Sequence, residues 1–154
     1  MLKEIKVTEM KATGGRFAIV ASKYNARYVD AMLRAATNVL KKARAEEVQV
    51  VRVPGAFEIP LVAAKLASAS PSPSAIICLG VILRGATTHA QSISDVVSYA
   101  LGTIALQTQT PVIHEVLLLE NEQQARERCL SKKRNRGAEA ALTAIEMSWL
   151  LARL

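Results

Sequence analysis

Short apolar runs rich in β-branched residues alternate along the chain with longer segments in which apolar residues recur at helical spacing. Four of the short runs predict β-strands, at residues 16–21, 48–53, 75–81 and 112–117. The run at 75–81 is apolar throughout, as expected for a strand that helices cover on both faces. Strands that alternate with helices over such short connections predict right-handed parallel crossovers and a three-layer α/β sandwich.

The segments between these strands predict helices through residues 29–43 and 93–104, after Asn121, and at 137–153. Asn121 and Gln124 have the spacing of a capping box, which predicts a short helix that ends near residue 130. The last helix is apolar along two stripes, so we expect it to pack on two sides, one of them against another subunit. The Pro- and Ser-rich stretch that precedes the third strand is expected to be a turn rather than a domain linker. We therefore expect a separate N-terminal arm at 1–15 and a single domain at 16–154.

Composition and charge narrow the class of protein. The chain has 154 residues, 51% of them apolar, and a net charge of +7, which excludes an intrinsically disordered chain. Its longest unbroken apolar stretch, 75–83, is far shorter than the roughly 20 residues that a membrane-spanning helix needs. Two cysteines do not form a disulfide framework, so a reduced, cytoplasmic location is expected. An apolar chain with only 4% aromatic residues is expected to bury more surface by forming an oligomer.

The segment after the third predicted strand has the features of an anion-binding helix start. Gly85, Ala86 and Thr87 are small, so their amides can approach a ligand closely at the positive end of the helix dipole. The spacing is similar to that of a P-loop, but Ala86 stands where the lysine is required, which excludes a typical nucleotide triphosphatase.

His89 follows this segment and is the candidate for proton transfer. Thr88 and Gln91 have capping-box spacing, which places His89 in the first helical turn. Imidazoles exchange protons near neutral pH, so a histidine beside a bound anion suits acid–base chemistry. A surface loop with a solvated histidine is an equally good interpretation of the segment alone.

The ends of the first two predicted strands carry further candidates, because ligands of open parallel sheets bind at the carboxyl ends of the strands. Residues 53–60, Val-Pro-Gly-Ala-Phe-Glu-Ile-Pro, offer turn amides and Glu58 to a polar ligand, although a turn with a Glu at a helix start explains them too. Asn25 is expected to cap the next helix. Tyr24 can stack on a flat heterocycle or simply pack against the protein.

A basic run at 126–136 contains six cations. Such a run is most often a solvated face, but it can also bind a polyanion, or one member can hold a small phosphate. Cys78 lies inside an apolar strand and is expected to be a buried, inert thiol. His89 and His114 lack partners at metal-ligand spacing, so no metal site is expected.

Three motifs occur in one order along the chain. They are the segment at 53–60, Ile-Cys-Leu-Gly with Arg-Gly-Ala-Thr-Thr-His at 77–89, and a C-terminal set at 127–147 that includes Glu-Arg, Lys, Asn and Gly-Ala-Glu-Ala-Ala-Leu. Together they resemble the 6,7-dimethyl-8-ribityllumazine synthase family of riboflavin biosynthesis from about residue 16 to the C-terminus. The resemblance implies a flavodoxin-like fold with a four-stranded parallel sheet of order 2-1-3-4. It also implies a homo-oligomer, either a pentamer or an assembly of pentamers such as a decamer or icosahedral shell, with active sites between subunits and the N-terminal arm added to a neighbour's sheet.

The resemblance implies a transferase that condenses 5-amino-6-(D-ribitylamino)uracil with 3,4-dihydroxy-2-butanone 4-phosphate, without a cofactor. His89 matches the histidine that transfers protons. Arg128 from the neighbouring subunit would pair with the phosphate, beside the amides and hydroxyl of Gly85, Ala86 and Thr87. The residues expected to contact the rest of the substrates are Tyr24, Asn25, Gly55, Ala56, Phe57, Glu58, Val81, Ile82, Leu83 and His114.

The chain departs from the family pattern at several positions. An aromatic, an acid and an aromatic usually follow the histidine, where this chain has Ala90, Gln91 and Ser92. His114 and Glu115 replace a Phe-Gly pair whose Phe reaches the adjacent subunit's substrate. These changes motivate a second hypothesis, a non-catalytic homologue that binds flavin or lumazine. The net charge and the basic run motivate a third, a nucleic-acid-binding module. We favour the enzyme, with small molecules rather than nucleic acid or membrane as its partners.

Overall fold

The structure is a computed structural model that describes Ala12 and residues 15–154. The predicted N-terminal arm at 1–15 lies almost entirely outside the described residues. Two of the elements are short turns, a 3₁₀ turn (η2) and a π-helical turn (η3). In chain order, the elements are β1 (Arg16–Ser22), α1 (Ala26–Lys42), β2 (Glu47–Val53), η2 (Ala56–Glu58), α2 (Ile59–Ala67), β3 (Ala75–Leu83), α3 (His89–Thr108), β4 (Val112–Leu119), α4 (Glu122–Ala125), η3 (Arg126–Leu130) and α5 (Arg136–Ala152).

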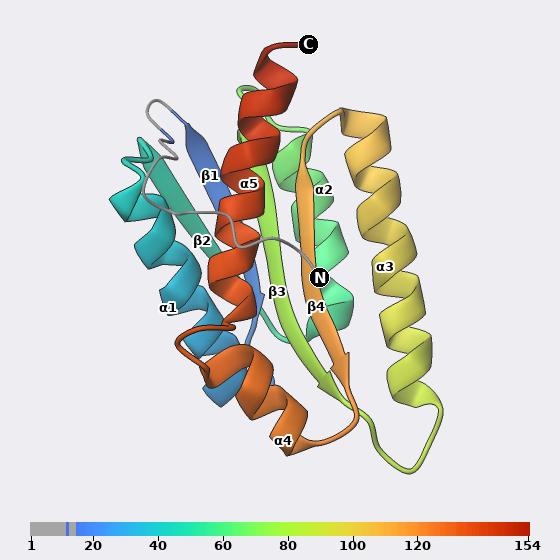
Figure 1. Ribbon diagram of the computed structural model, residues 1–154. Helices are drawn as coiled ribbons and strands as arrows, with labels where there is room; N and C mark the ends of the chain where they lie inside the picture. The colour runs from blue at the N-terminus through green and yellow to red at the C-terminus, as the bar shows by residue number, and fades with distance from the viewer. Residues whose placement is uncertain (1–11, 13–14) are drawn as a thin grey trace.

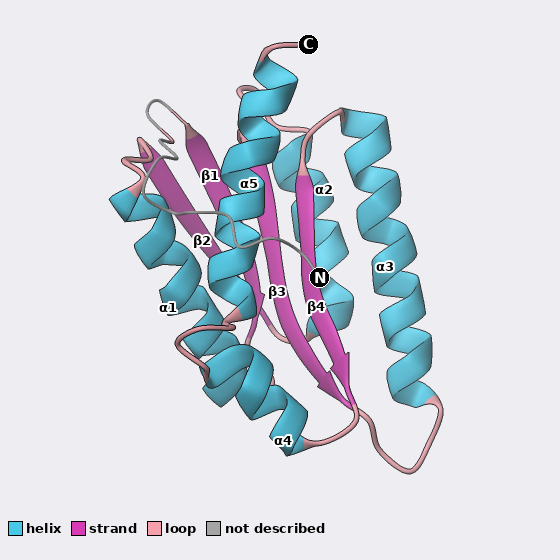
Figure 2. Ribbon diagram, viewed as in Figure 1, coloured by secondary structure: helices cyan, strands magenta, loops and turns pink. Residues whose placement is uncertain are grey.

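The four strands form one parallel sheet of order β2-β1-β3-β4, with β1 and β3 at its centre (Figure 1). Helices α1 and α5 cover one face, and α2 and α3 cover the other (Figure 2). This arrangement confirms the predicted three-layer, flavodoxin-like α/β fold and its strand order. All four strands end at the same edge of the sheet, because every pair is parallel.

The alternation of side chains along β1 divides the core into two clusters. Phe17 and Ile19 pack under α1 and α5, whereas Ala18 and Val20 pack under α2 and α3, and all four are buried. β3 is also buried over its first seven residues, as its uninterrupted apolar sequence predicts. Cys78 in this strand is buried, as predicted, and burial raises the pKa of its thiol to about 12.

The start of α5 is held by Asn135, which lies in the turn before the helix. Its side-chain Oδ1 accepts hydrogen bonds from the amides of Gly137 (2.8 Å) and Ala138 (3.3 Å), while its Nδ2 donates to the carbonyl of Cys129 in η3 (2.6 Å). One buried side chain therefore caps α5 and ties it to the preceding turn. The cap is the reason that α5 begins at Arg136, one residue before the predicted start.

The predicted capping box at Asn121 is only half correct. Asn121 Oδ1 accepts a hydrogen bond from the amide of Gln124 at 2.9 Å, as expected for an N-cap. The side chain of Gln124 instead accepts from the amide of Glu120, because the chain leaves β4 at that residue. The helix that follows is α-helical only to Ala125 and then widens into the π-helical turn η3. In the part of the chain that the structure describes, no helix combines the length and apolar character needed to cross a membrane.

Gly137 provides a test of the close contact between α1 and α5. A Cβ at this position would collide with the backbone carbonyl of Met32 in α1, whereas a Cβ at Gly102 on α3 would meet no atom within 4 Å. We expect Gly137→Ala to lower the free energy of unfolding by roughly 1–3 kcal/mol, because the two backbones must separate. Gly102→Ala is the matched control and should leave it unchanged or raise it by up to about 1 kcal/mol. Urea unfolding of both variants measures the difference, and equal midpoints would contradict the close contact.

Candidate active site

A groove of about 640 Å³ lies at the carboxyl edge of the sheet, between η2, the end of β3 and the first turns of α3. It brings together ten of the residues singled out from the sequence: Tyr24, Asn25, Gly55, Ala56, Phe57, Glu58, Val81, Ile82, Leu83 and His89. These residues come from three strand ends, which meet because the strands are parallel.

Backbone hydrogen bonds place Tyr24 at the groove. The amide of Lys23 donates to the carbonyl of Val53 at 2.8 Å, and the amide of Tyr24 donates to that of Pro54 at 3.1 Å. The loop after β1 is thereby fixed against the loop after β2. A Cβ at Gly55 would lie 2.9 Å from a ring carbon of Tyr24, so the ring packs directly over the glycine backbone. Tyr24 still remains 68% exposed, and Phe57 across the same turn is 59% exposed, so both rings are available to a ligand.

The prediction that Asn25 caps α1 is only half correct, because Asn25 occupies the N-cap position but its side chain does not cap the helix. Asn25 has the left-handed conformation, with φ at 57°, and its side chain makes no cap hydrogen bond. Its Nδ2 instead donates to the carbonyl of Val81 in β3 at 2.7 Å. Asn25 therefore holds the end of β1 against the end of β3, and only its backbone carbonyl accepts from the first turn of the helix.

Glu58 both stabilises its own turn and borders the groove. One carboxylate oxygen accepts a hydrogen bond from the amide of Gly55 at 2.9 Å, which closes η2. The side chain is otherwise exposed. Both sequence interpretations of this residue are therefore compatible with the geometry, because a carboxylate has acceptor capacity beyond a single hydrogen bond.

The loop between β3 and α3 connects two residues that line the groove, Leu83 and His89, but its own residues 84–88 are not part of the described lining. Gly85, Ala86 and Thr87 are exposed, and among the described residues none of their amides has a hydrogen-bond acceptor. His89 is the first residue of α3, with its amide 3.4 Å from Thr87 Oγ1. Unpaired amides at a helix start can bind an anion next to this imidazole.

The predicted capping box of Thr88 and Gln91 is wrong. The side chain of Thr88 makes no cap hydrogen bond, although α3 does begin directly after it. Gln91 accepts a hydrogen bond from Arg84 instead, at 2.8 Å. The guanidinium is the stronger donor, so the reciprocal capping pair does not form.

Three residues of α3 that line the groove, Ser92, Ile93 and Val96, were not among the predicted site residues, and Ser92 was named only as a departure from the family pattern. They stand three, four and seven positions after His89, which puts them on the same helix face. That spacing was a usable signal once His89 was assigned to the first turn.

Arg128 and His114, two further site candidates, lie outside this groove. Arg128 belongs to η3, which packs near α1 and α5 on the other face of the sheet. His114 lies in β4, the edge strand beyond β3. Among the described residues, neither side chain lines the groove.

The hydrogen bonds of His114 determine its tautomer. Nδ1 accepts from the amide of Val116 at 3.1 Å, so in the neutral ring the proton is on Nε2, which lies 2.7 Å from Ser98 Oγ. Ser98 then accepts a hydrogen bond, and the pair is not arranged as a base that activates a nucleophilic serine. Burial lowers the pKa of His114 below its ordinary value.

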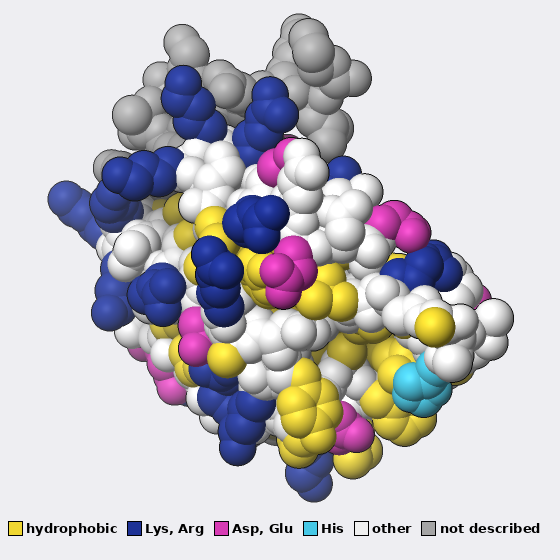
Figure 3. Space-filling view, turned by 90° about the horizontal axis from the view of Figure 1, so that it is seen from below, with side chains coloured by type: hydrophobic (Ala, Val, Ile, Leu, Met, Phe, Trp, Pro, Cys, Tyr) yellow, Lys and Arg dark blue, Asp and Glu magenta, His cyan; other side chains and the backbone are white. Residues whose placement is uncertain are grey.

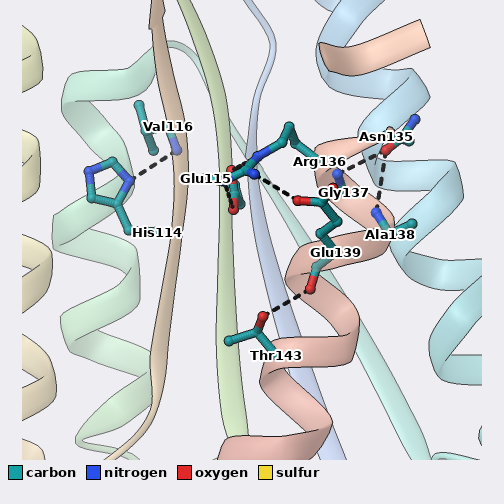
Figure 4. A network of polar contacts seen from close by, with 9 residues as sticks. All are labelled: His114, Glu115, Val116, Asn135, Arg136, Gly137, Ala138, Glu139 and Thr143. Carbon is teal, nitrogen blue, oxygen red and sulfur yellow. Dashed lines mark hydrogen bonds and ion pairs between the residues drawn. The ribbon is translucent and has the colours of Figure 1, made fainter. Parts of the chain in front are cut away.

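Glu115 projects from the opposite face of β4 into a network that sequence reasoning missed (Figure 4). Its carboxylate accepts two hydrogen bonds from Arg136, at 3.1 and 3.0 Å, and Arg136 also pairs with Glu139 at 2.7 Å. Burial raises the pKa of Glu115, and the positive charge of Arg136 opposes that shift. A glutamate inside an apolar strand was the signal that a buried cation had to be nearby.

Figure 3 views the molecule from the edge where the strands end. Lys and Arg side chains gather on one part of this face, and hydrophobic side chains with a histidine gather on another. The groove belongs to the hydrophobic part, since its lining among the described residues includes no Lys or Arg. Aromatic rings, an imidazole and free amides together can bind a flat, polar, anionic ligand and move protons on it.

Comparisons with known proteins agree with this chemistry. The family model described as 6,7-dimethyl-8-ribityllumazine synthase matches residues 14–152. A 6,7-dimethyl-8-ribityllumazine synthase from Desulfotalea psychrophila is 42% identical to the chain over 144 residues, which cover 92% of this chain and 92% of that protein.

The lowered pKa of His114 predicts a pH-dependent contribution to stability. The unfolded chain binds more protons at this residue near and below the ordinary value of 6.5, so folding loses stability as the pH falls through that value. We expect the stability of the wild type relative to His114→Asn to decrease between pH 8 and pH 5. Ser98→Ala keeps the imidazole and should show the same pH dependence as the wild type. Denaturant unfolding at several pH values measures the free energy of unfolding of each protein. If the stability of the wild type relative to His114→Asn increases as the pH falls, the pKa of His114 is not lowered by folding.

Proposed function

Since the chain belongs to the 6,7-dimethyl-8-ribityllumazine synthase family, we propose that the groove at the carboxyl edge of its sheet performs that family's reaction. The enzyme condenses 5-amino-6-(D-ribitylamino)uracil with 3,4-dihydroxy-2-butanone 4-phosphate to give 6,7-dimethyl-8-(D-ribityl)lumazine, and phosphate and water leave. The observation that carries the assignment of the site is the meeting of Tyr24 and His89 at one groove, with His89 directly after a loop whose amides have no acceptor among the described residues.

The pyrimidine binds against the aromatic side of the groove. The exposed ring of Tyr24, fixed over Gly55, stacks on the flat heterocycle. Glu58 and the backbone of η2 hydrogen-bond the polar groups of the ring and its ribityl chain. The apolar end of β3, Val81 to Leu83, excludes water from one side of the ring.

The phosphate of the second substrate binds at the loop before α3. The amides of Gly85, Ala86 and Thr87 and the hydroxyl of Thr87 donate to it, with help from the helix dipole. The ketone is then held beside the amine of the pyrimidine, and imine formation, phosphate elimination and ring closure follow. Most of the rate comes from holding the two reactants together, since oriented neighbours reach effective molarities of about 10⁵ M or more. His89 moves protons in these steps.

We propose that each complete site is shared between two subunits. The described lining of the groove contains no Lys or Arg to pair with a phosphate dianion, whereas Arg128 lies on another face of the same chain. A neighbouring copy can supply that cation, and His114 from its β4 can approach the same substrate. Exposed Tyr99 and Leu106 on α3, and Trp149 on α5, are apolar surface that an assembly would bury. The assembly is a pentamer or is built from pentamers.

The location proposed for the enzyme is the cytoplasm. The two cysteines support it, because both are buried free thiols within the described residues.

Loss of His89 tests the division between positioning and proton transfer. We expect His89→Ala to slow turnover on the order of 10²-fold while product still forms, because the reactants remain aligned. Lumazine fluorescence with both substrates measures the rate, and light scattering confirms that the variant assembles as the wild type does. Complete loss of product in an assembled variant would contradict this division. No product from the wild type at saturating substrates would favour a non-catalytic lumazine-binding protein.

Mixing two defective variants tests whether sites are shared. His89→Ala and Arg128→Ala should each be impaired alone. Subunits refolded together at equal amounts should regain activity at about a quarter of the sites, where an intact His89 meets an intact Arg128 of its neighbour. The His89→Ala chain refolded alone is the control. Activity no higher than the average of the two separate variants would show that the site lies within one chain.

A further inference from the structure

The loop that carries the proposed phosphate-binding amides has few contacts of its own. Gly85 to Thr88 are exposed, and a Cβ at Gly85 would meet no atom within 4 Å. Within the described residues, the one side-chain hydrogen bond inside the loop joins Thr87 Oγ1 to the amide of His89 at 3.4 Å, which is long. The position of the loop therefore depends on how its two ends are held.

Arg84 holds the first end. Its backbone amide donates to the carbonyl of Leu119 at 2.8 Å, where β3 and β4 end together. Its side-chain Nε donates to Glu120 Oε1 at 2.9 Å, and the pair also forms a salt bridge. The loop is thus attached through backbone and side chain to the point at which the chain leaves β4.

The same guanidinium also reaches the second end of the loop. Arg84 Nη2 donates to Gln91 Oε1 at 2.8 Å, in the first turn of α3. Gln91 is held in turn, because its Nε2 donates to Asp95 Oδ1 at 2.8 Å one turn further along the helix. Glu120 is held on its side by Gln124, whose Oε1 accepts from the amide of Glu120 at 2.9 Å.

We propose that Arg84 is a positioning residue for the condensation. Together with Glu120 and Gln91 it bridges both ends of the loop and fixes its amides and His89 in one geometry for the phosphate. The inference rests on the function proposed for this groove. The planar fork of arginine is needed, because Nε and Nη2 serve two acceptors on different elements at once, and a lysine ammonium on its flexible stem does not hold that geometry.

The geometry favours positioning over direct phosphate binding by Arg84. Two of the three nitrogens of its side chain are already engaged with protein acceptors, Nε with Glu120 and Nη2 with Gln91. The carboxylate of Glu120 also offsets its charge. With its side chain about one third exposed, the ion pair contributes little to overall stability, so its main effect is on the shape of the loop.

Arg84→Lys is the first test. We expect the KM for the phosphorylated ketone and the inhibition constant of inorganic phosphate to rise together, by about tenfold, because the amides no longer converge. The KM for the pyrimidine should stay within about twofold, since Tyr24 and Glu58 are untouched. Arg16→Lys is the matched control: it alters another arginine–glutamate pair, Arg16 with Glu47 at 2.7 Å, at the opposite edge of the sheet. Equal increases in both KM values, or no increase, would overturn the proposal.

Glu120→Ala distinguishes positioning from direct binding. If Arg84 positions the loop, the removal of its acceptor raises the KM for the phosphorylated ketone. If Arg84 binds the phosphate itself, the same change frees its charge, the KM falls, and the proposal is wrong. Gln91→Ala removes the other acceptor and should raise the KM as Glu120→Ala does, so it provides the test if Arg84→Lys fails to assemble.

The proposal can fail separately from the proposed function. If the wild type forms no lumazine, direct titration with inorganic phosphate still compares its affinity in the wild type and in Arg84→Lys. Weaker phosphate binding by the variant supports the bridge even then, and equal binding overturns it.

Discussion

The parallel pairing of β1 with both β2 and β3 is the constraint on which the site depends. In this register Ser22 lies beside Val53, so β1 and β2 end level, whereas Ala21 lies beside Leu79 and β3 continues past them to Leu83. The loops that follow them then meet without any long insertion. Short hydrogen bonds complete the alignment, from Lys23 to the end of β2 and from Asn25 to the end of β3. An antiparallel strand would send its loop to the opposite edge of the sheet.

The same topology separates the cations from the groove. Helices α2 and α3 frame the groove on one face, while η3 and α5, with Arg128 and Arg136, lie on the other. In the shared site that we propose, a neighbouring copy supplies the cation, and the same assembly would bury the exposed apolar residues of α3 and α5. Under that proposal the charge of η3 acts on a neighbour's site rather than on the chain's own.

Two polar networks hold the parts of the chain that bear chemistry. On one face, Glu115, Arg136 and Asn135 fix the start of α5 against β4 and η3. Near the groove, Arg84 joins the end of β4 to the start of α3. The hydrogen bonds of buried polar groups and of arginine side chains are directional, whereas apolar packing is not. These contacts therefore determine the geometry of the elements they join more than the overall stability. The edge strand β4 takes part in both networks, and His114 covers one of its otherwise unpaired amides at Val116.

The sequence by itself determined the layered fold and most of the groove. Period-two and helical apolar patterns depend on neighbours along the chain, and parallel crossovers bring strand ends together by necessity, so residues such as Tyr24, Glu58 and His89 could be assigned in advance. The sequence did not determine which partner each polar side chain takes. The side chain of Asn25 donates to β3 instead of capping α1, and the side chain of Gln91 accepts from Arg84 instead of pairing with Thr88. The carboxylate of Glu115 pairs with Arg136. Asn25 and Glu115 bond to partners far away in the chain, and these partners come within hydrogen-bond distance only when the sheet and helices have packed. Arg84 and Gln91 are closer in sequence, but their contact depends on how the loop between β3 and α3 folds.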